Sequence, residues 1–362
     1  MVTMEGTARR ARIEDVARVA GVHKSTVSRT WSQPDLVDPG TRARVEKAAD
    51  ELGYRPNTIA HMLATSTNPL VPLLVPDISN PFFAELARAV AAAVEPHGWH
   101  VTLCDTRGDA AGQRRYLESV AQLQVELLVV APGREEDLAE LVRWAEQARQ
   151  VTVLVDRAPE DAPVSSVSVD QRRGIELAME HLRERGHVRL AHVAGPPTTL
   201  TGRERCQRFV DAAGAFGLDA AVVPGGYDIP AGREGADAVL QLEPVPTALI
   251  AANDLCAIGL IGRFRERGLR VPEDISVVGY DGLDMTAYLQ PPLTTVRQPI
   301  GELAATAVEI GLAGVDHVRA GGVHTPRHTR LEPALVVRGS TSTPAGKHND
   351  RARRTESGAR SV

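Results

Sequence analysis

The feature that most constrains this 362-residue chain is a pair of short amphipathic segments, RIEDVARVAGVHKSTVSRTW, over residues 12–31. Apolar residues recur in the first segment at i, i+3, i+4 and i+7, as one stripe of a helix does: Ile13, Val16, Ala17 and Ala20. Gly21 follows where a tight turn between helices needs a positive φ. In the second segment Val27 and Trp31 are expected to face inward. The pattern predicts two helices joined at Gly21.

The outer face of the second predicted helix carries Lys24, Ser25, Ser28 and Arg29. Serine hydroxyls and lysine suit DNA phosphates, and an arginine can contact guanine through two hydrogen bonds. By itself, this window favours an ordinary amphipathic hairpin with a solvated polar face. The residues that follow it change that interpretation.

A third helix is predicted with clear start and stop signals. Asp38 suits the N-cap, Pro39 suits the first turn, and Gly53 ends the segment. Its apolar stripe is Val45, Ala48, Ala49 and Leu52. Asn57 then suits the cap of a further short helix, in which Ile59, Met62 and Leu63 stand at helical spacing.

This N-terminal region resembles the lac repressor family of bacterial transcription regulators. The matching residues, in order, are DVARVAGV, STVSR, PDLV, TRARV, ELGYRPN and the A-x-x-L of Ala60 to Leu63. The resemblance implies that Arg29 reads a base, with Lys24 and Ser25 beside it, and that Leu63 opens a base step from the minor groove. Phosphate or hinge contacts are implied for Thr26, Ser28, Tyr54, Asn57 and Ala60. His23 and Arg12 stand where the family has Ser and Thr caps, so both caps are expected to be weaker or replaced, and Trp31 implies a locally repacked head.

Charge is unevenly divided along the chain. The net charge of −5 comprises +2 over residues 1–68 and −7 over the remainder, and residues 8–31 hold six basic against two acidic side chains. A basic patch on an acidic body is typical of a DNA-reading head joined to a ligand-binding domain. Random variation over a short window would also give such a patch, so charge alone does not decide.

From residue 69 the pattern alternates between strands and helices. Strands are predicted at 73–75, 101–104, 127–130, 152–155, 190–193, 248–251 and 276–278. Such alternation indicates βαβ units and parallel sheets covered on both faces. We therefore predict a body of two α/β subdomains. Together with the family resemblance, this implies an all-α helix-turn-helix head plus an α/β periplasmic-binding-protein-like body of two doubly wound parallel-sheet subdomains.

The predicted boundaries divide the chain into four parts. Residues 1–56 form the head, 57–68 a hinge helix and linker, 69–342 the effector and dimerisation body, and 343–362 a disordered tail. Within the body, one subdomain is expected to hold about 69–168 and 298–327, and the other about 169–297 and 328–342.

Polar and aromatic residues follow the predicted strands, where sheets of this class bind ligands. Carboxylates, amides, guanidinium groups and a pair of phenylalanines together suit a sugar, whose hydroxyls need many hydrogen bonds and whose ring stacks on aromatics. The body is similar to the periplasmic sugar-binding proteins, and the resemblance implies these ligand residues: Asn80, Phe82, Phe83, Asp156, Arg157, Arg205, Asn253, Asp281 and Gln298.

Structural roles remain open for several of these residues. The NPFF segment at 80–83 could cap a helix, Asp156 and Arg157 could form a surface ion pair of little value, and Asp254 is expected to be an N-cap. Pro72 cannot donate to a ladder, so the first body strand is expected to begin after it. Arg208, where the family has Gly, is expected to crowd the helix behind the sugar site.

The sequence offers no support for catalysis or a metal site. It has no G-x-S-x-G, no phosphate-binding glycine loop, no H-E-x-x-H and no paired C-x-x-C. His181 and His187 are expected to cap a helix or face solvent, and the three cysteines to be reduced core thiols. No cofactor is expected.

We therefore expect a homodimeric, sugar-responsive DNA-binding regulator, most simply a repressor, acting on a near-palindromic operator. No membrane span or secretory signal is evident, so a cytoplasmic protein is expected. The alternatives are a regulator with a non-sugar effector, a sugar-binding protein or an enzyme. The sugar, the regulated genes and the direction of the response stay open.

Overall fold

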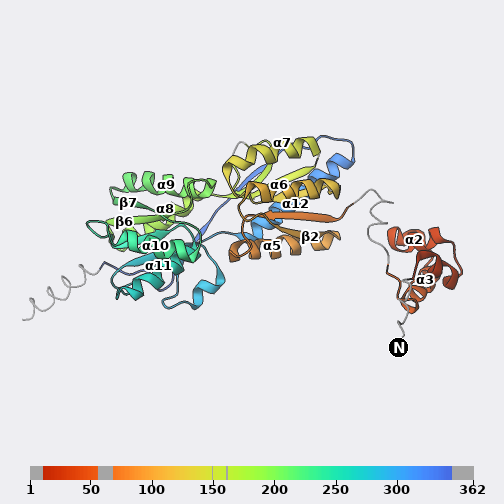
Figure 1. Ribbon diagram of the computed structural model, residues 1–362, viewed down its shortest axis with the longest axis horizontal. Coiled ribbons are helices and arrows are strands. Elements are labelled where there is room, and N and C mark those ends of the chain that lie inside the picture. Colours follow the sequence, from red (N-terminus) through yellow and green to blue (C-terminus); the bar gives the residue numbers. More distant parts are fainter. Residues whose placement is uncertain (1–10, 56–67, 149, 160–161, 345–362) are drawn as a thin grey trace, which may run out of the picture. The chain divides into compact units, whose positions relative to one another are not determined.

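The chain forms two compact units, residues 1–68 and 69–362, in a computed structural model (Figure 1). The structure describes residues 11–55, 68–148, 150–159 and 162–344. The predicted hinge residues 57–67, with Asn57, Ala60 and Leu63, and the tail 345–362 lie outside the described residues. Each unit is described separately below.

The head contains the three predicted helices: α1 (Ile13–Ala20), α2 (Lys24–Ser32) and α3 (Pro39–Glu51). A short 3₁₀ turn, Pro34–Leu36, links α2 to α3. Gly21 ends α1 with φ +65°, as the turn requires. The Asp38 carboxylate accepts a hydrogen bond from the Thr41 N–H at 2.9 Å, which confirms the predicted cap of α3.

The two unusual caps are replaced by other groups. His23 Nδ1 accepts from the Ser25 N–H at 3.3 Å and lies 2.9 Å from Ser25 Oγ. The imidazole therefore caps α2 in place of the expected serine. At α1 the Arg12 N–H donates to the Asp15 carboxylate at 3.0 Å. Both helix starts therefore keep a side-chain partner for one backbone N–H.

The head core is the predicted apolar stripe with one correction. Its buried residues are Val16, Ala17, Ala20, Val27, Val45, Ala48 and Ala49. Leu52 was predicted to belong to this stripe but is exposed, because α3 ends at Glu51 and the chain turns away there. Trp31 is half-buried and packs against Tyr54, with 5.9 Å between ring centroids.

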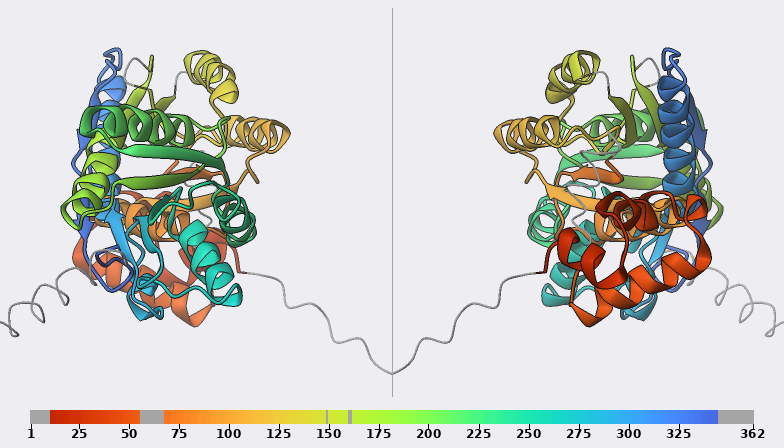
Figure 2. Two further views of the ribbon diagram at one scale, coloured as in Figure 1. Left: turned by 90° about the vertical axis from the view of Figure 1, so that its left-hand side faces the viewer. Right: turned by 90° about the vertical axis from the view of Figure 1, so that its right-hand side faces the viewer.

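The first body subdomain is built on a six-stranded parallel sheet in the order β11-β5-β4-β3-β1-β2. Its strands are β1 (Leu70–Val75), β2 (His100–Asp105), β3 (Leu127–Val130), β4 (Val151–Asp156), β5 (Ser165–Val169) and β11 (His328–Leu331). One face packs on α5 (Pro81–Val94) and α12 (Ile300–Arg319), and the other on α6 (Ala110–Gln122) and α7 (Leu138–Ala148). Figures 1 and 2 show this layering.

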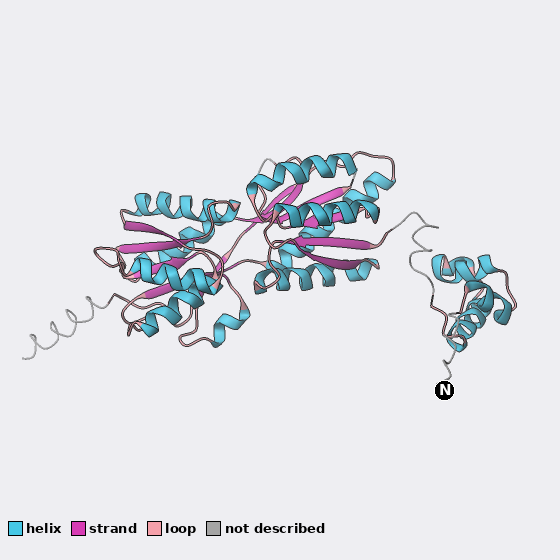
Figure 3. Ribbon diagram, in the orientation of Figure 1, coloured by secondary structure: helices cyan, strands magenta, loops and turns pink. Residues whose placement is uncertain are grey.

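The second subdomain repeats the plan with the order β12-β10-β9-β8-β6-β7. Its strands are β6 (Arg189–Ala194), β7 (Asp219–Pro224), β8 (Ala248–Ala251), β9 (Ser276–Asp281), β10 (Thr294–Arg297) and the antiparallel β12 (Ala334–Val336). Helices α8 (Gln171–Glu184) and α9 (Leu200–Phe216) cover one face, and α10 (Ile229–Val239) and α11 (Asp254–Glu266) the other (Figure 3). All seven predicted strands are confirmed, and β5, β7, β10, β11 and β12 are additional.

The chain passes between the two subdomains three times: after β5, after β10 and between β11 and β12. The last crossing corrects the predicted boundary at residues 327/328. His328 to Leu331 pair with Ser166 to Val169 of β5, so they belong to the first sheet. The crossing itself lies between Leu331 and Ala334.

The expectation that the first body strand begins after Pro72 is wrong. β1 begins at Leu70, and Pro72 pairs with Thr102 in the register. The carbonyls of Pro69 and Val75 accept hydrogen bonds from His100 at the start of β2 and from Thr106 just after its end. Because a parallel strand bonds its two neighbours with alternate residues, Pro72 faces β3, whose pairing begins only at Leu73.

His181 and His187 are buried, contrary to the expectation that they cap a helix or face solvent. His181 Nε2 lies 2.9 Å from Thr341 Oγ1, and His187 Nε2 lies 2.8 Å from the Ser342 carbonyl oxygen. They fasten the end of the described chain to the second subdomain. Cys104 and Cys256 are buried thiols as predicted, whereas Cys206 is only half-buried.

The burial of His192 leads to a prediction of how the stability of the body changes in acid. It is fully buried in β6, its Nδ1 lies 2.8 Å from the Ile250 carbonyl oxygen, and burial lowers its pKa to about 4. A lowered pKa gives stability that is complete above the ordinary value near 6.5 and is lost as pH falls through about 4. His192→Asn, which keeps a donor for Ile250, should flatten the fall in urea midpoint between pH 7 and 4.5. An unchanged pH profile would contradict this.

Candidate functional site

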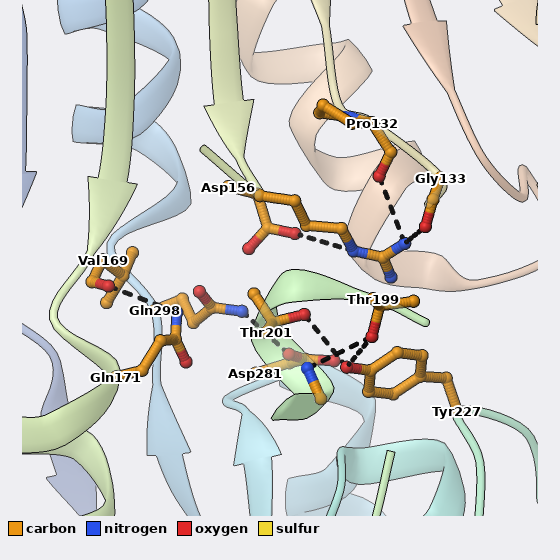
Figure 4. Close-up of polar contacts among 12 residues, drawn as sticks. Pro132, Gly133, Asp156, Val169, Gln171, Thr199, Thr201, Tyr227, Asp281 and Gln298 are labelled. Atoms are coloured by element: carbon orange, nitrogen blue, oxygen red, sulfur yellow. Dashed lines mark hydrogen bonds and ion pairs between the residues drawn. The ribbon is translucent and has the colours of Figure 1, made fainter. Parts of the chain in front are cut away.

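The polar residues that follow the strands meet in one cleft between the two body subdomains (Figure 4). All nine residues predicted to bind the effector line this cleft. Thr201 and Tyr227 line it as well. The cleft is narrow, since the space open to the centre of a water molecule is about 10 Å³, roughly one water.

Asn80 and the phenylalanine pair enter the cleft from the start of α5. Asn80 is buried, and its Oδ1 accepts from the Phe82 N–H at 3.1 Å, so it caps the helix while lining the cleft. Phe82 and Phe83 are both 2% exposed and pack edge to face at 5.1 Å. The cap interpretation and the ligand interpretation of the NPFF segment are therefore compatible.

Asp156 and Arg157 end β4 in a sharp turn and are both buried, so they are not a surface ion pair. Asp156 has φ +66°, and Arg157 Nε lies 3.6 Å from Asp156 Oδ2. The Arg157 Nη1 donates to the carbonyls of Pro132 and Gly133 at 3.4 and 3.2 Å. Burial raises the pKa of Asp156, and the charge of Arg157 opposes that rise.

Arg157 also joins the two sides of the cleft. Its guanidinium carbon lies 5.4 Å from the ring centroid of Phe83 in the first subdomain and 5.1 Å from that of Tyr227 in the second. At such distances the cation is attracted by both ring faces.

Arg205 is held in the floor of the cleft by neutral groups. Its Nε donates to Gln171 Oε1 at 2.7 Å, and its Nη1 donates to the Ala252 carbonyl at 2.7 Å. Its guanidinium carbon lies 3.6 Å from the centroid of the Tyr280 ring. These contacts fix the guanidinium plane, which prepares it for directional hydrogen bonding.

Asp281 and Gln298 meet where β9 and β10 end. Gln298 Nε2 donates to Asp281 Oδ1 at 2.9 Å, and the Asp281 backbone has φ +113°. Burial raises the pKa of Asp281 to about 8, and the nearby Arg205 opposes the rise.

Three polar atoms in the cleft are shielded from solvent and have no hydrogen-bond partner among the described residues. They are two acceptors and one donor: Asp156 Oδ1, Gln298 Oε1 and Arg157 Nε. Such buried groups cost free energy until they are satisfied. A ligand that both donates and accepts hydrogen bonds would satisfy all three.

The sequence reasoning missed Tyr227 and Thr201. The Tyr227 hydroxyl lies 3.1 Å from Thr199 Oγ1 and 2.9 Å from Thr201 Oγ1. Tyr227 follows β7, a strand that was not predicted, so the rule that ligand residues follow strands could not reach it. Thr201 carries only a small hydroxyl in the first turn of α9, where it resembles a helix-start residue.

The expected cap role of Asp254 is wrong. Asn253 is the N-cap of α11: its Oδ1 accepts from the Cys256 N–H at 2.8 Å, and its Nδ2 donates to the Tyr227 carbonyl at 3.0 Å. Asp254 is wholly buried and instead accepts from Thr295 Oγ1 and the Leu283 N–H. Arg208 is exposed on α9 and does not crowd the cleft.

A larger cavity of about 380 Å³ lies in the first subdomain between the ends of α6 and α12. Four valines and an alanine form much of its wall, with Gln124, Glu126 and Gln150. We take the narrower cleft as the candidate ligand site because it gathers paired charges, amides and aromatics at the strand ends, as sites in such sheets do. The described residues contain no group of His, Cys, Asp and Glu able to hold a metal ion.

The head presents the predicted DNA face on α2. Lys24, Ser25, Ser28 and Arg29 are exposed, opposite the buried Val27. Thr26 and Tyr54 are half-buried at the edge of this face. A polar helix face of this kind suits the major groove of DNA.

Comparisons with known proteins agree with this architecture. Residues 12–57 match the family model described as bacterial regulatory proteins, lacI family, and residues 179–341 match a periplasmic binding protein-like domain. The HTH-type transcriptional repressor PurR of Photobacterium profundum is 34% identical over 334 residues, covering 91% of this chain and 98% of that protein. The ribose operon repressor of Escherichia coli K12 is 32% identical over 337 residues, with 91% and 99% covered.

Solved structures show the same fold. The lac repressor dimer bound to operator and the anti-inducer ONPF aligns with a TM-score of 0.80 at 26% identity, covering 92% of this chain and all of that one. A regulator from Enterococcus faecium with bound ribose has a TM-score of 0.66 at 26% identity, with 76% and 99% covered.

The fold and these relatives define a DNA-binding regulator with a ligand-binding body. The chain belongs to the lacI family of bacterial regulatory proteins. It is therefore a transcriptional regulator and not an enzyme. Among the described residues, no helix has the length and apolar character needed to cross a membrane.

The raised pKa of Asp281 predicts a second pH effect, opposite in sign to that of His192. A raised pKa gives stability that is complete below the ordinary value near 3.8 and is lost as pH rises through about 8. Asp281→Asn keeps an acceptor for Gln298 without the charge, and Asn tolerates the positive φ. The thermal midpoint of the variant should exceed that of the native protein by an amount that grows from pH 5 to pH 8.5. A difference that is constant with pH would contradict this assignment.

Proposed function

We propose that this protein is a repressor that binds a near-palindromic operator as a homodimer and whose operator affinity is controlled by a small sugar in the body cleft. The observation that carries the proposal is the set of shielded atoms in the cleft, two acceptors and one donor, beside a phenylalanine pair. A hydroxyl group both donates and accepts hydrogen bonds, so adjacent sugar hydroxyls can satisfy these two acceptors and one donor. The apolar face of the sugar ring can pack against the phenylalanine rings.

The alternative effector is a non-sugar molecule. The Enterococcus faecium relative holds ribose and another holds cellobiose, whereas the name PurR specifies no sugar. Thermal-shift screening of the full chain against D-ribose, D-galactose, cellobiose and sugar phosphates separates the two cases. Stabilisation by no sugar would favour the non-sugar effector.

The exposed face of α2 supports a reading role for Arg29 in the major groove, with Lys24 and Ser25 beside it. We assign phosphate contacts to Thr26, Ser28 and Tyr54, and also to Asn57, which lies outside the described residues. Residues 57–64 are too few for a stable isolated helix, so we propose that this hinge orders only on DNA, with Leu63 as the wedge and Ala60 beside it.

Arg29→Ala should relax sequence preference at one base pair of each half-site by roughly 1–3 kcal/mol, because a bidentate base contact is lost. Ser28→Ala, as the matched phosphate contact, should weaken all operator sequences equally. Fluorescence anisotropy with a set of single-base operator variants measures both effects. Equal loss of specific and non-specific binding in the Arg29 variant would show that Arg29 does not read a base.

Arg205→Ala and Asp281→Ala should abolish the response to sugar while leaving operator affinity without sugar largely intact, because both line the cleft and neither lies in the head. Arg208→Ala is the matched control, one turn along α9 on the exposed side. Calorimetric sugar titration measures the loss, and a native melting curve for each variant is required. Unchanged sugar affinity in both cleft variants would eliminate this site.

The homodimer is supported by the lac repressor relative, solved as a dimer, and by exposed apolar side chains in the 3₁₀ segment Asp284–Tyr288. Within it, Met285 and Tyr288 are 47% and 87% exposed. Residues 341–362 contain no Leu, Ile, Met or Phe, so they offer no coiled-coil seam.

We therefore predict a dimer held by the body. Sedimentation equilibrium should give the same dimer with and without residues 345–362. A tetramer that becomes a dimer on this deletion would contradict the prediction.

A further inference from the structure

One ion pair on the body joins the two subdomains beside the cleft. Glu135 begins a 3₁₀ turn, Glu135–Asp137, that follows β3 in the first subdomain, and Arg203 lies in the first turn of α9 in the second. The two side chains pair through both guanidinium Nη atoms, with Nη2 2.7 Å from Oε1. The Glu135 N–H also donates to the Thr198 carbonyl at 3.0 Å, so the same two segments are joined twice.

The segments that carry the pair lie on the side of the cleft away from the three crossing segments. Figure 4 shows Val169, Gln171 and Gln298, which belong to the crossings, on one side of the cleft. Gly133 and Thr199 stand on the opposite side, within four residues of Glu135 and Arg203 respectively. Opening about the crossings would separate these segments first.

The segment that carries Arg203 also reaches the cleft wall. The Arg203 N–H donates to the Thr199 carbonyl at 3.1 Å, and the hydroxyls of Thr199 and Thr201 contact the Tyr227 hydroxyl. Tyr227 in turn faces Arg157 of the first subdomain. The pair is therefore connected through a few contacts to residues that line the ligand site.

Solvent exposure limits the strength of the pair. The Arg203 and Glu135 side chains are 54% and 38% exposed. Exposed pairs of good geometry shift an equilibrium by about two- to five-fold, and salt screens them. A contact of that strength adjusts an open–closed equilibrium without locking it.

We propose that Glu135 and Arg203 form a salt-sensitive clasp that holds the cleft closed over its effector and lengthens the residence time of that effector. The clasp rests on the proposed function in so far as the cleft binds an effector. Neither residue lines the cleft, so the clasp acts on closure and not on effector contacts.

The experiment uses the full chain with Glu135→Gln, Arg203→Gln and the double variant. Arg233→Gln is the matched control, because Arg233 and Glu266 form a bidentate pair with both distances 2.8 Å but within the second subdomain. Stopped-flow measurement of sugar release reports the residence time. The sugar is whichever of D-ribose, D-galactose and cellobiose binds most tightly. Spin labels at exposed Glu146 in α7 and Gln207 in α9, in a cysteine-free background, report the distance between subdomains without any ligand.

The clasp predicts a two- to five-fold faster release and a larger open population in both single variants, with no further change in the double variant. Effector release from the native protein should become faster by a similar factor when NaCl is raised from 50 to 500 mM. In the clasp variants the same rise in salt should cause no further increase in the release rate. Arg233→Gln should behave as the native protein. Unchanged release rates and distances in both clasp variants, or an equal change in the control, would overturn the proposal. If no sugar binds but the distances shift as stated, the clasp is supported and the proposal of a sugar effector is contradicted.

Discussion

The body depends on one constraint: two separate apolar cores face each other across a thin layer of polar and charged side chains. Each sheet is covered by its own helices, and the parallel strands that precede the site residues end at the cleft. Three crossing segments join the subdomains, with Leu283 of the second packed into the core of the first. Between them lie Arg157, Asp156 and Gln298, which are buried and incompletely hydrogen-bonded. Two rigid parts with an unsatisfied polar boundary are well suited to respond to a ligand that fills it.

Burial decides the electrostatics of this boundary. It raises the pKa of both Asp156 and Asp281, while the two guanidinium groups oppose that rise. The cations are themselves held by neutral carbonyls, an amide and aromatic faces. The side chains of the cleft walls are thus held in place, whereas polar atoms at its centre lack hydrogen-bond partners. This arrangement favours a ligand rich in hydroxyl groups.

Much of this site could be predicted because strand ends converge in a parallel sheet, so that residues such as Asp156 and Asn253 were found from strand position and family resemblance together. Tyr227 was missed because β7 has an exposed, weakly alternating sequence that does not read as a strand. The predicted start of β1 was wrong because the effect of Pro72 depends on which neighbouring strand it faces. That is a property of the whole sheet. The Glu135–Arg203 pair joins residues 68 positions apart, a contact that no local pattern encodes. Leu52 and His187 show the same limit, since burial at an element's end depends on how the chain continues.

The central claim is that the cleft and the DNA-binding head share one equilibrium. Thermodynamic linkage requires that if sugar changes operator affinity by some factor, operator changes sugar affinity by the same factor. The direct measurement is the sugar dissociation constant of the full-length protein, by calorimetry, alone and saturated with operator DNA at one salt concentration. We predict that the two constants differ by the factor by which the sugar alters operator affinity, in the same sense. A sugar affinity that operator leaves unchanged would contradict the account.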